Sequence, residues 1–433
     1  MQPLQGVPKH LARNPGARDR WFVLSLLFVN YFVLYAHRFL VNYIQVPLQE
    51  DLGLSELQLN ATTWAFHVTY ALAQLFVGYL SDRFSRRTVL ISALAASTIA
   101  FSAMGLAQGF YDMFALRVAL AATQAASVPA IAGIMADCFV QQNRSRAVSI
   151  YLLSSPFSLI VAGAAGGALA ENFGWRVSIA CFGAGGFVVV CVIALLLREP
   201  ERTERAEKKG LGVEGASLSR TLLTVLSVRS FLLLALAYLM ASNVSQQLAY
   251  FLPRYFSERF GMDLQESGAM ATIAPQIGTV IGLLSGGALA DLLARRWPGG
   301  RFVVQIGGLC LAIPAIYLIS FTDSTSVILC ALFVSGIGFW LYFSNLWTTT
   351  FDVVDPAARS TAIGLLNVAA GVFGSWPYLV VGKLRDDGVI TDLRTVFFTF
   401  ACVLIASAVI LLIIVQVTLR KDLQSPVNES LSE

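Results

Sequence analysis

The chain has 433 residues, of which 56% are hydrophobic and only 13% are charged. A soluble domain would carry about 25% charged residues, so this composition excludes an ordinary water-soluble protein. With six cysteines and a net charge of +4, it also excludes a disulfide scaffold and a nucleic-acid-binding protein.

Long apolar stretches follow one another along the whole chain. Each reaches the roughly 17–25 residues that a helix needs to cross a ~30 Å hydrocarbon core. They are too long for the strands of an outer-membrane barrel, which have about 10 residues of alternating polarity. The sequence therefore predicts an all-α membrane protein with twelve transmembrane helices, at residues 22–46, 59–80, 89–107, 112–137, 146–169, 177–197, 230–253, 268–290, 303–321, 327–349, 361–381 and 396–418.

Most Lys and Arg residues fall in segments that share one side of the membrane. These segments are the N-terminal tail, residues 83–87, residues 198–229, residues 295–301 and the C-terminal end. Because cytoplasmic segments carry an excess of Lys and Arg, we expect both termini in the cytoplasm and the protein in a bacterial inner membrane.

A charged, Gly-containing stretch divides the chain into two halves of six spans each. Such a stretch has no apolar face to bury, which is typical of a linker. We expect a cytoplasmic tail at 1–21, an N-terminal six-helix bundle at 22–197, a cytoplasmic linker at 198–226, a C-terminal six-helix bundle at 227–418 and a cytoplasmic tail at 419–433.

Two motifs occur once in each half. The first runs from Gly78 through Asp82, Arg83, Arg86 and Arg87, and it recurs 209 residues later as Gly287, Asp291, Arg295 and Arg296. The second, Asp137-x6-Arg144, recurs 215 residues later as Asp352-x6-Arg359. Repetition at almost one offset, on one side of the membrane, predicts a duplicated bundle whose halves are related by an axis along the membrane normal.

These features resemble the major facilitator superfamily over nearly the whole chain. Residues 78–87 match the family's loop signature Gly-x-x-x-Asp-Arg/Lys-x-Gly-Arg/Lys-Arg/Lys, except that Ser85 replaces the second glycine. The resemblance implies two six-helix bundles and a cytoplasmic latch made of helix-capping and ion-pairing residues. The latch residues that it implies are Gly78, Asp82, Arg83, Arg86, Arg87, Asp137, Arg144, Asp291 and Arg295. The alternative is that Arg86 and Arg87 only anchor the topology.

A narrower resemblance concerns two subgroups of that family. Tyr35-Ala-His37-Arg38 resembles the Tyr-x-Asp-Arg motif of the anion:cation symporters and the Spinster-like transporters. The stretch from Arg117 to Gln124 resembles their Arg-x-x-x-Gly-x-x-Glu motif. Residues 129–139 and 374–382 look more like the Spinster-like group, whereas residues 251–255 look more like the symporters, so the subfamily stays divided.

Arg38 and Arg117 are the two basic residues inside the apolar stretches. An Arg inside a span costs at least ~2.5 kcal/mol on insertion scales and persists only beside a cavity or a partner. Its guanidinium offers a rigid bidentate fork to carboxylate, phosphate or sulfonate. Helical spacing and depth predict a substrate site made of Tyr31, Tyr35, Arg38, Asn42, Arg117, Gln124, Gln247, Tyr250, Asn345 and Asn367. The alternative is that Arg117 snorkels to the surface and Arg38 bonds to backbone carbonyls.

The motif positions at which proton-coupled relatives carry carboxylates hold His37 and Gln124 in this chain. Gln124 cannot titrate, and an imidazolium at His37 would meet the like charge of Arg38. His37 is the candidate for proton coupling, because an arriving anion would supply the missing counter-charge. If His37 stays neutral instead, we expect an exchanger or a uniporter.

The sequence favours a secondary active transporter that moves a small organic anion of the carboxylate type by alternating access, with proton symport as one option. A Spinster-like lysolipid transporter is the alternative that the resemblance implies. An enzyme is disfavoured because GxSxG, HExxH and a paired acid and base at membrane depth are all missing from the sequence. We expect a monomer in the lipid bilayer, without a metal or another cofactor.

Overall fold

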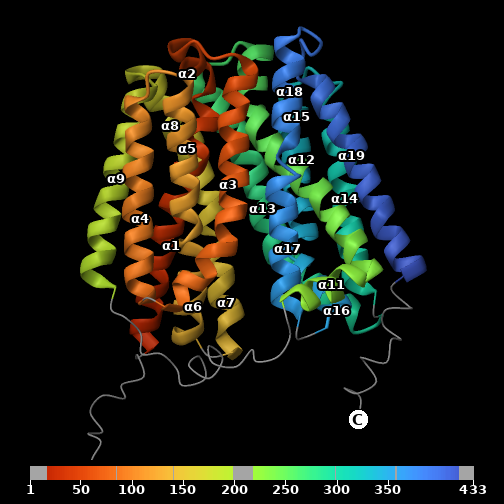
Figure 1. The fold of residues 1–433 in the computed structure, drawn as a ribbon. Coiled ribbons are helices and arrows are strands. Elements are labelled where there is room, and N and C mark those ends of the chain that lie inside the picture. Colours follow the sequence, from red (N-terminus) through yellow and green to blue (C-terminus); the bar gives the residue numbers. More distant parts are fainter. Residues whose placement is uncertain are drawn as a thin grey trace, which may run out of the picture.

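The computed structural model describes residues 17–83, 85–139, 141–197, 218–297, 299–355 and 358–418. Throughout these residues the regular structure is helical. Figure 1 shows the helices running roughly side by side in two groups, α1 to α9 in one and α11 to α19 in the other.

The N-terminal half packs its helices around two buried apolar clusters. Leu120 and Phe101 lie in one cluster and Leu94 in the other, all of them fully buried. The helices are α1 (Ala17–Phe39), η1 (Leu40–Tyr43), α2 (Gln45–Leu52), α3 (Glu56–Arg83), α4 (Arg86–Ala103), η2 (Met104–Leu106), α5 (Phe110–Ala125), α6 (Ser127–Cys138), α7 (Gln141–Leu152), α8 (Ser154–Phe173) and α9 (Trp175–Leu196).

The C-terminal half has its largest cluster of buried side chains along α12, where Tyr250, Phe251 and Phe256 are almost fully buried. Its helices are α11 (Leu218–Ser227), α12 (Arg229–Phe260), α13 (Leu264–Ala294), α14 (Gly300–Ile319), α15 (Thr325–Phe343), α16 (Leu346–Val353), α17 (Arg359–Val372), α18 (Trp376–Asp386), α19 (Arg394–Ile413) and the π-helical turn η4 (Ile414–Thr418).

Eleven helical segments of the described residues are long and apolar enough to cross a membrane. α3 adds a further helix of 28 residues, which packs between α5 and α18. Together they account for the twelve predicted spans, so the predicted fold class is confirmed.

Two boundaries differ from the sequence-based prediction. α1 begins at Ala17, inside the predicted tail 1–21, and α11 occupies part of the predicted linker 198–226. α11 buries Val225 in a cluster with Ala362 and Leu366 of α17. A short helix that is apolar along only one face has a modest average hydropathy, which is why the linker prediction included it. The remainder of the linker and both ends of the chain lie outside the described residues.

The two halves approach each other closely at the end of the bundle where α2 lies, which we call the α2 end (Figure 1). α8 meets α13 through glycines: a Cβ on Gly163 would lie 2.7 Å from the carbonyl oxygen of Gly268 and 2.8 Å from the Thr272 side chain. α3 meets α18 near Gly382, where a Cβ would lie 2.9 Å from the carbonyl oxygen of Glu56. Missing side chains therefore let the backbones of the two halves touch.

Candidate functional site

Arg38 lies near the end of α1 and is partly buried among aromatic rings. Its guanidinium carbon is 4.2 Å from the ring centroid of Tyr70, 5.1 Å from that of Tyr35 and 5.2 Å from that of Phe66. Its Nε donates a hydrogen bond of 3.3 Å to the side-chain oxygen of Gln124. Ring faces and an amide oxygen stabilise a cation without neutralising it.

Arg117 on α5 is 1% exposed and contacts the backbone of Arg38. It donates to the backbone carbonyl of Arg38 at 3.1 Å and to the hydroxyl of Thr63 at 3.2 Å, and its guanidinium carbon is 5.0 Å from the Phe66 ring. This burial excludes the alternative that Arg117 snorkels to the surface. Arg117 braces the end of α1, and Arg38 is the more accessible of the two cations.

Both cations lack a carboxylate partner within the described part of the chain, where every ion pair involves other residues. Gln124, the neutral residue at the motif position, donates its amide to the carbonyl of Leu34 at 3.0 Å while it accepts from Arg38. Charged residues inside a membrane are costly and occur where they face a cavity or a partner, so this pair marks a candidate functional site.

Tyrosines surround the Arg38 guanidinium. The ring centroid of Tyr31 lies 4.5 Å from that of Tyr35 and 4.4 Å from that of Tyr151, and Tyr70 stacks on Phe66. Tyr70, Phe66 and Tyr151 are not among the site residues predicted from the sequence. A signal for two of them was present, because Thr63, Phe66 and Tyr70 follow the helical spacing of one face.

A cavity of about 160 Å³ lies between the two halves next to this cluster. Tyr35 belongs to both, since it lines the cavity and also contacts the Arg38 guanidinium. The other walls come from α1, α8, α12, α13 and α15, with Phe39, Ser155, Leu159, Ser245, Gln246, Leu248, Ala249, Leu252, Ala271, Pro275, Gln276, Thr279, Leu332, Ser335, Gly336, Phe339 and Trp340.

The side chain of His37, the residue before Arg38, lies away from the Arg38 cluster, between α4 and α9. Its imidazole is completely buried, stacks on Phe101 of α4 at 4.0 Å and places Nε2 3.2 Å from the carbonyl oxygen of Phe182 on α9. A Cβ on Gly186 would lie 2.7 Å from the ring. His37 therefore packs inside the N-terminal bundle, whereas Arg38 faces α3 and α5. This geometry argues against the predicted role of His37 as a proton carrier beside the substrate.

Asn42 and Tyr250 join the two halves rather than line the cavity. The backbone carbonyls of both residues accept hydrogen bonds from the amide of Gln45, at 2.8 and 2.7 Å. The Tyr250 hydroxyl also donates to the side chain of Asn60 on α3 at 2.8 Å. Both predicted site residues thus lie at the closed contact between α12 and the N-terminal half.

Gln247 and the two remaining asparagines of the predicted site also lie outside the cavity wall. Gln247 donates to Asn243 at 2.9 Å, and Asn243 in turn donates to the carbonyl of Gly374, where α17 ends before α18. Asn345 donates to the carbonyls of Gly286 and Leu341 at the break between α15 and α16. Asn367 is half-buried on α17. Gln247, Asn243 and Asn345 stabilise helix breaks.

Equivalent ion pairs occur at the opposite end of each half. Arg86 pairs with Asp137 in the N-terminal half, and Arg301 pairs with Asp352 at 2.6 Å in the C-terminal half. Both residues of the second pair lie 215 positions after those of the first. Arg301 is therefore the residue of the C-terminal half that is equivalent to Arg86. The sequence motif had instead aligned Arg86 with Arg295.

The other predicted latch residues have different surroundings. Arg87 donates to the carbonyls of Leu197 and Ala194, both at 2.5 Å, and thereby ties α4 to the end of α9. Arg295 is exposed, and Asp291 lies 3.8 Å from Arg301. The surroundings of Gly78 and the side chains of Asp82, Arg83 and Arg144 lie outside the described part of the structure.

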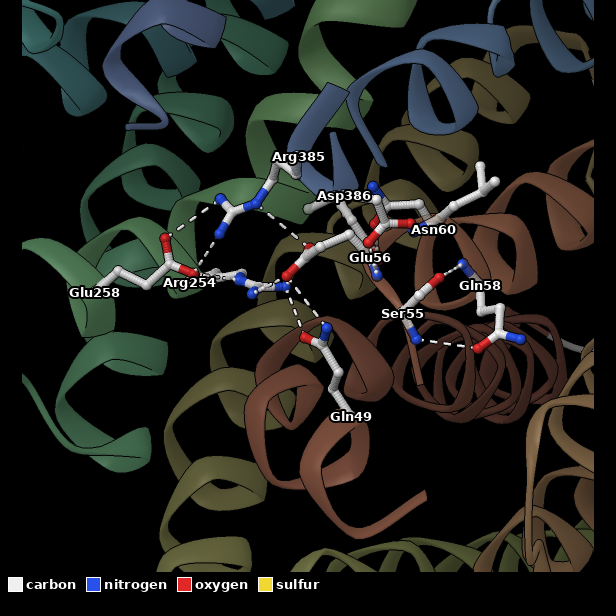
Figure 2. Close-up of polar contacts among 11 residues, drawn as sticks. Gln49, Ser55, Glu56, Gln58, Asn60, Arg254, Glu258, Arg385 and Asp386 are labelled. Carbon is white, nitrogen blue, oxygen red and sulfur yellow. Dashed lines mark hydrogen bonds and ion pairs between the residues drawn. The ribbon is translucent and has the colours of Figure 1, made fainter. Parts of the chain in front are cut away.

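A denser ionic network closes the α2 end between the halves (Figure 2). Glu56, at the start of α3, accepts from Arg254 of α12 at 2.5 and 2.8 Å and lies 3.4 Å from Arg385 of α18. Glu258 accepts from Arg254 at 2.5 Å and from Arg385 at 2.8 Å, and Gln49 accepts from Arg254 at 2.9 Å. None of Glu56, Arg254 and Arg385 is among the site or latch residues predicted from the sequence.

Asp386 adds a second link of the same kind. Its carboxylate accepts from the backbone N–H groups of Glu56 at 2.8 Å and Leu57 at 3.0 Å. These are free donors of the first turn of α3, where a negative charge is favoured. A helix of the N-terminal half is thus capped by a residue of the C-terminal half.

Two duplicated bundles that meet at one end through ion pairs, with a cavity between them, define a two-bundle membrane carrier. The chain belongs to the Major Facilitator Superfamily, whose profile matches residues 27–376. The resemblance stated from the sequence is thereby confirmed. The protein is a multi-pass membrane transporter of a small molecule and not an enzyme.

Individual relatives are distant but cover most of the chain. An MFS-type efflux pump of Mycolicibacterium smegmatis is 26% identical over 392 residues, covering 89% of each chain. A hexuronate transporter of Bacillus subtilis is 24% identical over 392 residues, covering 86% of this chain and 89% of its own. A crystal structure of a bacterial homologue of the human lysosomal transporter Spinster, described as inward-facing and occupied, superposes with a TM-score of 0.78 at 21% identity and covers 94% and 99% of the two chains.

Proposed function

We propose that the protein is a secondary carrier of an organic anion and that Arg38 binds the anionic group. The observation that carries this proposal is a partly accessible guanidinium held by ring faces and an uncharged amide, without a carboxylate partner among the described residues. A hexuronate, the substrate in the name of the Bacillus subtilis relative, is itself a carboxylate, which agrees with this charge.

Transport proceeds by alternating access, with the α2 end facing outward. The positive-inside rule places this end outside the cell, and the network of Glu56, Arg254 and Arg385 holds it closed. Substrate then exchanges with the cytoplasm in the state described. Opening of the α2 end requires the ion pairs across the halves to separate, while pairs within one half move with their bundle.

Anion exchange or uniport is the coupling mode that the geometry favours over proton symport. His37 is sealed between α4 and α9, and Gln124 is an amide that both accepts and donates within the protein. The anion gradient, or a counter-transported anion, supplies the driving force.

Uptake into proteoliposomes tests the proposal. With radiolabelled glucuronate and phenylacetate as alternative probes, native protein is expected to show saturable flux of at least one of the two anions. Arg38→Ala is expected to abolish this flux, and Arg38→Lys to leave only a small residual flux because Lys lacks the bidentate fork. Arg229→Ala, which changes an exposed arginine at the start of α12, is the matched control. Unchanged flux in Arg38→Ala at equal protein density would refute the site.

A further inference from the structure

The number of cations that can reach the cavity limits the charge of the substrate. None of the cavity-lining residues within the described chain is Lys, Arg, His, Asp or Glu. Arg117 is 1% exposed and already donates to Thr63 and to the Arg38 carbonyl. Arg38 is thus the one guanidinium next to Tyr35 that an anion in this cavity could reach, and a second carboxylate would be buried without a partner, which is strongly unfavourable.

The cavity walls favour a substrate whose uncharged part, called its body below, is apolar. Phe39, Leu252, Leu332, Phe339 and Trp340 supply most of the surface, together with other aliphatic side chains. A substrate with several hydroxyl groups would lose hydration there without replacing its hydrogen bonds.

Two of the four serine and threonine hydroxyl groups on the cavity wall are already engaged in hydrogen bonds to the backbone. Ser155 already donates to the carbonyl of Leu152 at 3.0 Å, and Ser335 to that of Leu332 at 2.8 Å. Gln246 and Gln276 are half-buried on the wall and provide two amides. Together with the hydroxyl groups of Ser245 and Thr279, these amides can bind a few polar substituents, but not a hydroxyl group on every carbon of a chain.

The size of the cavity sets the length of the body. A volume of about 160 Å³ is close to the ~150 Å³ of an engineered apolar cavity in another protein that binds benzene. A ring-sized group fits this space. Tyr35 lines the cavity and also contacts the Arg38 guanidinium, so a ring stacked beside Tyr35 would bring its acidic group toward Arg38.

We propose that the transported anion carries a single negative charge and one apolar, ring-sized body, as in an aromatic monocarboxylate. This inference rests on the proposed anion site at Arg38 and names the substrate class of that site. It distinguishes the chain from a carrier of sugar diacids, which needs a second cation, and from a lysolipid carrier, which needs a longer apolar groove.

Equilibrium dialysis of purified native protein with radiolabelled phenylacetate tests the inference. Phenylacetate is expected to bind saturably. Unlabelled galactarate, 18-carbon lysophosphatidate and the uncharged phenylacetamide are each expected to compete at least tenfold more weakly than unlabelled phenylacetate. Absence of phenylacetate binding, or stronger competition by galactarate or lysophosphatidate, would overturn the inference.

Two matched tryptophan variants locate the apolar body. Trp340→Ala removes a cavity wall and should weaken phenylacetate binding at least tenfold, whereas Trp347→Ala changes a side chain that is 57% exposed on α16 and should leave it unchanged. Equal effects of the two variants would refute the placement. If galactarate binds best and Arg38→Lys weakens it, the substrate class is wrong and the anion site stands. If Arg38→Lys affects no anion, the proposed function itself fails.

Discussion

Replacing Glu56 by Gln is expected to open the α2 end. The Glu56 carboxylate connects the N-terminal half to Arg254 and Arg385 of the C-terminal half. When the halves separate, both arginines keep Glu258, which belongs to their own half. The loss of the Glu56 charge therefore destabilises the closed state selectively.

The magnitude follows from burial and geometry. The side chains of Arg254, Arg385 and Glu56 are 9%, 10% and 15% exposed, so solvent screens their interaction only weakly. A hydrogen bond to a charged group contributes about 1.5–3 kcal/mol net, and Gln can replace part of the bidentate contact with Arg254. A net cost of about 2–3 kcal/mol changes the ratio of closed to open molecules by roughly 30–150-fold.

Double electron–electron resonance, which measures the distance between two spin labels, provides the assay. Spin labels at Glu50 on α2 and at Val389 after α18 would report on the two halves, since both positions are exposed, in a variant with the six cysteines replaced. Glu56→Gln is expected to add a longer distance component. Asp323→Asn is the matched control, because Asp323 pairs with Arg259 and Arg394 within the C-terminal half. An unchanged distribution in Glu56→Gln, or the same shift in Asp323→Asn, would refute the reasoning.

Two further substitutions test other contacts of the same mechanism. Gly163→Ala places a Cβ 2.7 Å from the Gly268 carbonyl and should also open the α2 end and slow transport several-fold. Gly185→Ala, where a Cβ meets nothing within 4 Å, should do neither; equal spectra for the two variants would contradict the contact. His37→Gln should lower the transport rate but keep the native pH profile, because the imidazole donates to Phe182 away from Arg38. A pH dependence that disappears only in His37→Gln would restore the proton role.

The fold was predictable because apolar runs and basic loops report directly on the bilayer. The long spans from 22–46 onward follow from local composition, and the duplication follows from the motifs that recur at almost one offset. α11 was not predicted because an amphipathic surface helix is not apolar on average. The ion pair between Glu56 and Arg385 was not predicted because nothing in either segment indicates that residues 329 positions apart lie in contact.

The candidate site was predicted less completely, for a physical reason. Helical spacing gives the face of one helix but not the rotation of that helix within a bundle, so it grouped Asn42 with Arg38. A break in the helix separates them, since Asn42 lies in η1 beyond the end of α1. Asn243 follows the helical spacing expected of ligands, and Asn345 is a single polar residue in its span. Both residues serve helix breaks in the structure, and the sequence does not distinguish them from ligands.

Gln124 connects the charge of the site to its coupling. Its amide holds Arg38 in place and leaves the positive charge for the anion to neutralise. A carboxylate at this position would itself neutralise Arg38 and would have to be protonated or displaced before an anion could bind. Gln124→Glu should therefore weaken phenylacetate binding tenfold or more at neutral pH. Binding by this variant should recover as the pH falls and the new carboxylate is protonated, whereas binding by the native protein should stay constant while phenylacetate remains ionised. Equal pH profiles for the two proteins would mean that a carboxylate at position 124 does not compete with the anion for Arg38, which would refute this reasoning.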